Sequence, residues 1–267
     1  MDALRNKARE LLENKLAQVV IGYGEGSLGR VRPVFVKEPA AAVKLVYDGR
    51  CLQNLATYLL KPEVKKMGKI ALVAKPAALK TVLQLAAENQ IVNGEIIVLG
   101  VTADGKLIDF PDFKAIEAHV AASGPDLSPE ELAVLDRLSH MSVEERWAYW
   151  QEQLSRCFKC YACRAACPLC YCTRCTVECN QPQWIPVPAH DLGNLEWHVM
   201  RAMHLAGRCV NCGDCGRACP LDIPLNLLTQ MLVKGVGEHF GQRAGISATL
   251  DHALSTFKPN DKENFIG

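Results

Sequence analysis

The first 125 residues alternate short apolar runs with amphipathic stretches. Leucines at near-helical spacing among charged neighbours predict a surface helix over residues 3–18. Two β-branched runs around a glycine-rich turn predict a hairpin over residues 19–36. Apolar runs at 70–74 and 96–101 flank a helical stretch, an arrangement typical of parallel strands covered by helices. We therefore expect residues 1–125 to form an α/β domain, with a mainly parallel sheet covered by helices.

The glycine-rich turn admits a second interpretation, as a phosphate cradle. Its glycines, Gly22, Gly24, Gly26 and Gly29, follow neither dinucleotide nor nucleoside-triphosphate spacing. A cradle also needs a helix N-terminus directly after the turn, and here more strand follows. The plain hairpin is therefore favoured.

Residues 126–234 change to helical patterning. Ser128 and Ser142 are each followed by glutamates that can complete a capping box, so both predict helix starts. The second helix places apolar residues at i, i+4, i+7 and i+11, which predicts a packed stripe. That stripe comprises Val143, Trp147, Trp150 and Leu154. The helix leads directly to the first of a dense group of cysteines.

A later helix is expected to end at Gly207, a natural C-cap. Its apolar stripe comprises Leu195, Val199, Ala202 and Ala206. His198 and His204 are interpreted as ordinary surface or interface histidines rather than ligands. Residues 235–267 contain glycines among polar residues and are expected to form a C-terminal tail, either flexible or ordered against a partner.

The composition of the chain limits the classes of function that it can have. The 267-residue chain is 49% hydrophobic and carries a formal net charge of +1, a balance that favours neither nucleic acid nor an anionic membrane as partner. No segment reaches the roughly 18 to 20 apolar residues that span a bilayer. The amphipathic start also lacks the apolar core of a secretory signal. We expect a soluble, cytoplasmic protein without a membrane span.

Cysteines dominate the second half of the chain. Twelve of the 13 fall between positions 157 and 219. In a reducing compartment such clustering indicates metal rather than disulfides. The thirteenth, Cys51, is expected to be a buried free thiol.

Two stretches repeat the spacing Cys-x2-Cys-x2-Cys-x3-Cys-Pro, beginning at Cys157 and at Cys209. In two-cluster ferredoxins the first three cysteines of such a run bind one 4Fe-4S cubane, and the fourth crosses to the other cluster. By that rule cluster I would be held by cysteine set I: Cys157, Cys160, Cys163 and Cys219. Cluster II would be held by cysteine set II: Cys209, Cys212, Cys215 and Cys167. Zinc is disfavoured because a tetrahedral site does not call for a third cysteine at the same interval followed by a cysteine–proline pair. Residues 126–234 are therefore expected to form a helix-rich, ferredoxin-type iron–sulfur domain.

An insert between the two motifs carries a third group of cysteines, Cys170, Cys172, Cys175 and Cys179. Their spacing could hold a third 4Fe-4S cubane, a zinc ion, or three ligands that await a fourth from a partner. A third cubane is favoured, because the two flanking motifs already indicate that the chain binds iron–sulfur clusters.

Three stretches resemble a known family: EERWAYWQEQLSRCFKCYACRAACPLCYCTRC, HLAGRCVNCGDCGRACPLDIPL and, more weakly, VYDGRCLQNLATYLL. The family comprises the beta subunits of coenzyme F-420 (deazaflavin) hydrogenases and formate dehydrogenases, especially bacterial relatives associated with heterodisulfide-reductase-like complexes. The resemblance covers most of residues 18–232. It implies other redox subunits as partners and an FAD beside the clusters. Many relatives have a Gly-Cys-Asp loop where this chain reads Ala74-Lys75-Pro76-Ala77-Ala78, a departure that argues against the flavin.

Three functions remain open at this stage. The leading hypothesis is a non-catalytic wire that relays electrons through two or three cubanes inside a hetero-oligomeric oxidoreductase, since no acid–base pair or nucleophile constellation is evident. The alternative is a flavin-containing subunit that itself reduces a deazaflavin or nicotinamide carrier. The third is a structural interaction protein stapled by zinc.

Overall fold

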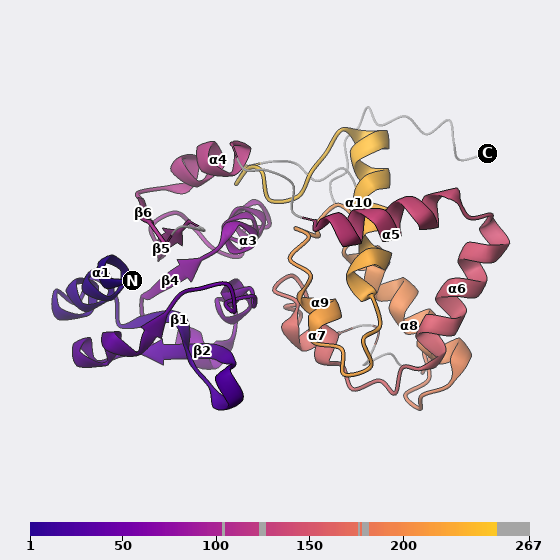
Figure 1. Cartoon of the computed structure of the whole chain (residues 1–267), viewed down its shortest axis with the longest axis horizontal. Helices are drawn as coiled ribbons and strands as arrows, with labels where there is room; N and C mark the ends of the chain where they lie inside the picture. Colours follow the sequence, from indigo (N-terminus) through magenta and orange to yellow (C-terminus); the bar gives the residue numbers. More distant parts are fainter. Residues whose placement is uncertain (103–104, 123–126, 176, 178–181, 250–267) are drawn as a thin grey trace.

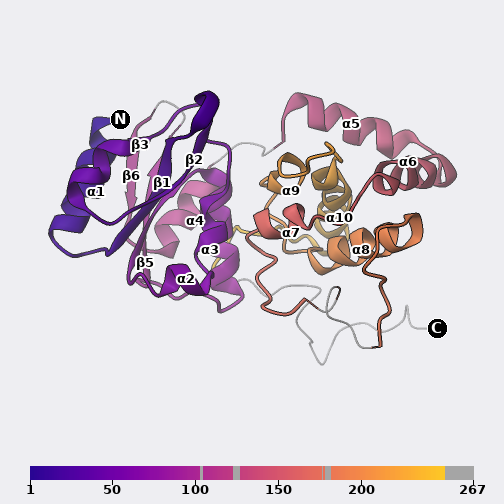
Figure 2. The ribbon, with the colours of Figure 1, turned by 90° about the horizontal axis from the view of Figure 1, so that it is seen from below.

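A computed structural model describes residues 1–102, 105–122, 127–175, 177 and 182–249. The chain forms two lobes, an α/β lobe from its first 122 residues and a helical lobe that begins at residue 129 (Figures 1 and 2). Among the described residues, no helix combines the length and the apolar character needed to cross a bilayer.

The strands of the α/β lobe are β1 (Val19–Glu25), β2 (Val31–Val36), β3 (Leu45–Val46), β4 (Ile70–Ala74), β5 (Ile96–Val101) and β6 (Leu107–Phe110). Its helices are α1 (Asp2–Glu13), α2 (Pro62–Lys65), α3 (Pro76–Ala87) and α4 (Phe113–Ala121), with short 3-10 turns η1 (Ser27–Gly29), η2 (Pro39–Lys44) and η3 (Leu55–Tyr58). The helical lobe comprises α5 (Pro129–His140), α6 (Val143–Ser155), α7 (Ala162–Ala166), α8 (Asp191–His204), α9 (Asp214–Arg217) and α10 (Leu225–Phe240).

The sheet is mixed rather than mainly parallel. Its strand order is β2-β1-β4-β5-β6, with β3 also paired to β1. Only the central strands β1, β4 and β5 run parallel, and β2, β3 and β6 pair antiparallel to their neighbours. The reason lies in the connections: a short turn joins β1 to β2 and another joins β5 to β6, and short turns permit only antiparallel pairing. The parallel pair β4 and β5 is joined by the crossover helix α3.

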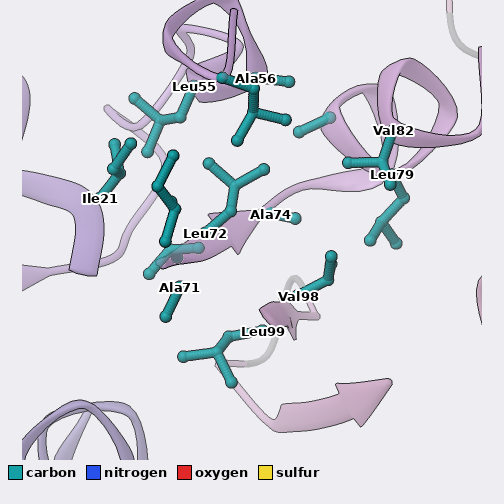
Figure 3. Packing of buried hydrophobic residues seen from close by; sticks show 14 of the residues in the cluster. Ile21, Leu55, Ala56, Ala71, Leu72, Ala74, Leu79, Val82, Val98 and Leu99 are labelled. Carbon is teal, nitrogen blue, oxygen red and sulfur yellow. The ribbon is translucent and has the colours of Figure 1, made fainter. Parts of the chain in front are cut away.

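The core of the lobe lies between this sheet and the helices that cover it. Helix α1 lies on the side of the sheet away from the helical lobe, and α3 lies on the side towards it (Figures 1 and 2). Leu72 of β4 is fully buried, and Leu79 and Val82 of α3 pack in the same apolar cluster (Figure 3). Burial of one such leucine contributes about 1.5–3 kcal/mol. Cys51 is buried in this core as a free thiol, as predicted.

Both predicted capping boxes are present in the helical lobe. The Ser128 hydroxyl accepts a hydrogen bond from the Glu131 amide, and the Glu131 carboxylate accepts one from the Ser128 amide. Ser142 opens α6 in the same way. The predicted stripe of α6 is correct only in its second half, where Leu154 packs with Trp197 and Trp150 packs with Leu227. Val143 and Trp147, in the first half, are 68% and 50% exposed.

The end of the helical lobe differs from the expected tail. Helix α10 continues through Gly235 and Gly237 and ends at Phe240, where Gly241, with φ of +65°, is its C-cap. The expected boundary at residue 235 therefore falls inside a helix. Beyond it the chain returns to the α/β lobe, where the Gly245 amide donates to Gln84 Oε1 at 3.0 Å and the Ala248 amide to Glu117 Oε1 at 2.7 Å. Residues 242–249 are thus ordered against this chain itself, and residues 250–267 lie outside the described part.

Candidate metal centre

The two cysteine motifs fold into loops with the same backbone pattern. The second residue after the first cysteine has positive φ in both loops, +55° at Lys159 and +61° at Asn211. The residue after the second cysteine is also left-handed, +58° at Tyr161 and +73° at Gly213. A short helix follows each loop, α7 in the first and α9 in the second, and these two helices pack together. The sequence repeat is therefore also a structural repeat.

This backbone pattern turns amide groups towards the sulfur atoms. The Lys159 amide donates to Cys157 Sγ at 3.3 Å, and the Asn211 amide donates to the equivalent Cys209 thiol. Alternation of right- and left-handed residues creates concave groups of N–H donors that bind anions, iron–sulfur centres included. The two loops thus provide donors suited to negatively charged sulfur.

All four members of cysteine set I line one small cavity, together with Tyr161, Trp197 and His198. Cys157 lies close enough to Cys160 and Cys219 to interact with both electrostatically. Burial, despite partial relief by Arg201, raises the pKa of the Cys163 thiol to about 12. Apolar neighbours of the helical lobe, among them Leu154 and Ile223, pack around the other three members, whereas Cys160 is exposed.

The members of cysteine set II also interact with one another. Burial and then the charge of Cys215 raise the pKa of Cys209 to about 12, and burial raises that of Cys212 as well, with Cys167 and Cys209 among its neighbours. Cys167, Cys209 and Cys212 pack against the core of the α/β lobe. Set II therefore borders the first lobe, and set I lies within the second.

Among the described residues, no group of three or more His, Cys, Asp or Glu side chains is arranged so that it could hold a metal ion. The fit of a cluster must be judged from the donors themselves. Each set offers four thiols and no carboxylate, which is the ligand type of 4Fe-4S cubanes.

Helix α8 supplies further evidence of fit, because it turns polar side chains inwards. Trp197 Nε1, both ring nitrogens of His198 and Arg201 Nε are buried and lack a hydrogen-bond partner within the described structure. Burial of a donor without a hydrogen-bond partner lowers the stability of the folded state. Sulfide and thiolate acceptors of a bound cluster would satisfy such groups, so the residues present fit an anionic iron–sulfur centre.

The inward face of α8 corrects two predictions. Val199, expected in the buried stripe, is 38% exposed, whereas His198, expected at a surface or an interface, is 2% exposed. Trp197, on the same face, is 3% exposed. Burial lowers the pKa of His198 to about 3, so its ring is neutral at physiological pH. His204 is exposed, in accordance with the prediction. Asn194 and Arg201 were missed, although their spacing with Trp197 and His198 at three and four residues marks a common helix face.

The insert cysteines line a different cavity, of about 650 Å³, between the helix α8 and the end of α3. Cys170, Cys172 and Cys175 contribute to its wall, as do Arg201 and Arg208. The Cys170 amide donates to the Cys167 carbonyl of set II at 3.2 Å, so the insert adjoins the second set. Cys179, the fourth insert cysteine, lies outside the described residues.

Ionic contacts fasten the second loop to the α/β lobe. Arg208, directly before Cys209, forms a bidentate pair with Glu88 at 2.6 and 2.7 Å. Burial opposes the ionised form of Glu88, but the Arg208 hydrogen bonds hold the pKa of its carboxyl below the ordinary value. On the other side of the loop, Asp214 accepts a hydrogen bond at 2.7 Å from the Asn54 amide.

A second large cavity, of about 840 Å³, opens between the lobes. The turn of the β1–β2 hairpin forms one wall, with Gly29 and Arg30, and the helix α9 forms another, with Asp214 and Arg217. Arg50 also lines it. The predicted hairpin is present as the antiparallel pair β1 and β2. Its turn faces a cavity that Arg30, Arg50 and Arg217 line.

Comparison with known proteins gives a partial match. No protein-family profile matches the chain. Over 102 residues, 38% of this chain, it is 33% identical to the F420-dependent formate dehydrogenase subunit beta of Methanocaldococcus jannaschii. Over 105 residues it is 30% identical to the F420-dependent formate dehydrogenase 1 subunit beta of Methanococcus maripaludis. The matches cover 26% of each relative, so the chain spans about a quarter of the curated relatives' length. The resemblance to beta subunits is thus supported, and its bacterial refinement stays a prediction, because both relatives are archaeal.

Proposed function

We propose that this chain is an iron–sulfur electron-transfer subunit of a cytoplasmic, multi-subunit oxidoreductase: a hydrogenase, formate dehydrogenase or heterodisulfide-reductase-like complex. The observation that carries the proposal is the pair of matching cysteine loops with the same left-handed positions. Two matching loops suit two like centres. Similarity to proteins named as formate dehydrogenase beta subunits supports a place in such an assembly.

Cysteine sets I and II would each hold one 4Fe-4S cluster, and bound clusters supply one-electron transfer. The chain itself provides the thiolates, the amide donors of the two loops and the apolar enclosure. Because set II borders the α/β lobe and set I lies in the helical lobe, the two sets suit successive stations of a relay. No residue near them needs to act as an acid or a nucleophile for this role.

The insert would hold a third centre. Three of its cysteines share the 650 Å³ cavity beside set II, a position that suits an extension of the relay. Iron analysis tests this directly: a third cubane predicts about twelve irons per chain, three centres of four. About eight irons with one zinc would instead make the insert a structural staple.

The interlobe cavity favours one alternative, a subunit that binds a flavin and reduces a deazaflavin or nicotinamide carrier. Its volume lies within the usual range of cofactor sites, roughly 300–1,000 Å³, and Arg30 would attract an anionic group. Arg50 is already paired with Asp48 and Glu25, and Arg217 with Asp214. Lys75, in the loop that departs from the family pattern, is already engaged with the Cys51 carbonyl at 2.6 Å. Stoichiometric flavin in protein purified from its own cells would favour this alternative over the simple wire.

The decisive experiment compares Cys160→Ser and Cys212→Ser, one from each set, with Cys51→Ser as the matched control. Cys51 is a buried thiol that belongs to neither set. Each set variant should lose about four irons and the matching acid-labile sulfide from anaerobically purified protein. The control should keep all iron. Wild-type protein that contains zinc without acid-labile sulfide would refute the proposal and support the zinc-stapled interaction protein.

A further inference from the structure

Arg201 of α8 occupies an unusual position between the two cysteine sets. Its side chain is nearly inaccessible, with 6% of the residue exposed. One terminal nitrogen donates to the Cys163 carbonyl of the first loop at 3.0 Å, and Cys215 of the second loop lies close enough to act on the guanidinium electrostatically. A single buried cation therefore lies beside both loops.

The negatively charged groups near this cation are cysteine thiolates rather than carboxylates. Cys170, Cys167, Cys215 and Cys163 are the groups whose negative charge acts on it. Among the ion pairs of the described residues, none joins Arg201 to an Asp or Glu, in contrast to Arg208 and Arg217. A buried charge without an opposite charge costs several kcal/mol. The neighbouring cysteines are therefore the negative groups available to it, and Nε is a buried donor without a hydrogen-bond partner in the described structure.

We propose that Arg201 is a positioning residue whose charge sets the reduction potential of the iron–sulfur centres beside it above the value that they would otherwise have. The inference rests on the proposed function.

The physical basis is electrostatic. Reduction of a four-thiolate cubane adds one electron to a centre that is already anionic, so a nearby cation favours the reduced state. Water and salt screen an exposed arginine, whereas a buried one is screened far less. Arg201 is therefore expected to outweigh the exposed basic residues of the helical lobe.

The test uses the full chain with its clusters loaded. Arg201→Gln and Arg201→Met remove the charge, Arg201→Lys keeps it, and Lys234→Gln removes one positive charge from an exposed site on α10 as the matched control. Mediated titrations followed by electron paramagnetic resonance give the potential of each centre. Cys160→Ser and Cys212→Ser assign the two signals to their sets.

In Arg201→Gln and Arg201→Met, the reduced-to-oxidised ratio of at least one centre should fall at least tenfold at a fixed solution potential, a shift of about 59 mV for a one-electron couple. Arg201→Lys should restore most of the wild-type ratio, and Lys234→Gln should change neither centre by more than about twofold, because its charge is screened. Loss of iron from the Gln and Met variants alone would also support the proposal, since only a cation would then permit assembly.

Two results would overturn it. One is a fully loaded Gln or Met variant with wild-type potentials at both centres. The other is loss of iron from Arg201→Lys as complete as from Arg201→Met, which would assign the residue to packing. Wild-type chain without iron would instead contradict the proposed function, so the two failures are distinguishable.

Discussion

The left-handed backbone positions are the residue-scale feature that most constrains the cysteine loops. Glycine occupies one of them, Gly213, while tyrosine occupies the equivalent position in the first loop, Tyr161. A non-glycine residue there costs roughly 1–2 kcal/mol. Tyr161 gains packing in return, because its ring lies 5.3 Å from that of Trp197. The second loop has no such ring, so glycine is the residue that relieves the strain.

We predict that Gly213→Ala weakens the set II loop. A Cβ at this position would lie 2.6 Å from Arg217 Nη1, and the φ of +73° adds backbone strain. The expected result is a loss of about 1–2 kcal/mol and faster release of iron under a chelator. Gly94→Ala is the control, because φ is +84° there and nothing lies within 4 Å of the added carbon. Equal rates of iron release in the two variants would contradict a local role for Gly213.

At the scale of elements, the buried face of α8 is polar, unlike the apolar face of a helix that packs on an ordinary hydrophobic core. The helix buries Asn194, Trp197, His198 and Arg201 and exposes Val199. Carbonyls of the first cysteine loop accept hydrogen bonds from this buried face. Asn194 Nδ2 donates to the Cys157 carbonyl at 2.6 Å and to the Leu154 carbonyl at 3.2 Å. The amide thus fixes the start of the first loop to the helix.

We predict that Asn194→Leu loses iron from set I in preference to set II. The substitution leaves the buried carbonyls of Leu154 and Cys157 with one donor fewer, a loss of about 1–3 kcal/mol. Iron analysis and urea unfolding measure the two effects. Met200→Ala, at a position on the same helix that is 42% exposed, should change neither. An Asn194→Leu protein with full iron and unaltered stability would exclude this anchoring role.

The same helix explains which predictions from sequence succeeded. Capping boxes at Ser128 and Ser142 are local, so their residues sufficed to predict two helix starts. The stripe of α8 was predicted on the rule that buried helix positions are apolar. That rule fails where carbonyl groups and thiols lie against the helix. Likewise, glycines at 235 and 237 lowered the expectation of a helix, yet α10 packs against α5, α8 and α9. Tertiary packing there outweighs the low helix propensity of glycine.

The division of the cysteines was predictable only in part. Spacing alone suggested that Cys167 joins the second motif and Cys219 the first. Cys157 lies near Cys219 and Cys212 near Cys167, an arrangement that suits the crossing. The assignment of the ligands to two clusters stays a prediction. That set II borders the α/β lobe could not have been predicted, because it depends on contacts such as Asn54 to Asp214, 160 residues apart.

At the scale of the whole molecule, the Glu88–Arg208 pair is a main contact between the lobes. Tyr171 adds a third hydrogen bond, from its hydroxyl to Glu88 Oε2 at 2.7 Å. The Glu88 side chain is only 8% exposed, so removal of one partner leaves a charge poorly solvated. Residues 242–249 provide a second link, through α3 and α4.

We predict that Glu88→Gln destabilises the protein by about 3–5 kcal/mol at pH 7, because Arg208 loses its counterion. The pH dependence has a definite sign. The pKa of Glu88 is lowered in the folded state, so its stabilisation is complete above the ordinary carboxyl pKa and is lost as the pH falls through the lowered value. The difference in unfolding free energy between wild type and variant should therefore be constant near neutral pH and shrink in acid.

Urea unfolding of both proteins across this range measures that difference. Glu63→Gln, on α2 and exposed, is the control and should show no such effect. A wild-type advantage that grows as the pH falls would contradict the assignment of Glu88 as an ionised partner.

The last prediction is that the chain works as part of a larger assembly. A relay needs a donor and an acceptor, and the two cysteine sets lie in different surroundings, one beside the α/β lobe and one within the helical lobe. Large apolar side chains also remain exposed on the helical lobe, among them Trp184 at 75% and Phe158 at 56%, and clusters of such residues are typical of interfaces. Native mass measurement of protein isolated anaerobically from its own cells should give a complex larger than the 29.3 kDa of this chain. The same chain produced alone, as the control, should hold its iron and accept electrons from a chemical reductant without turning over a two-electron carrier. A 29.3 kDa monomer from its own cells that reduces a nicotinamide, flavin or deazaflavin at a useful rate would overturn the wire hypothesis, and it would direct attention to the arginine-lined cavity between the lobes as the catalytic site.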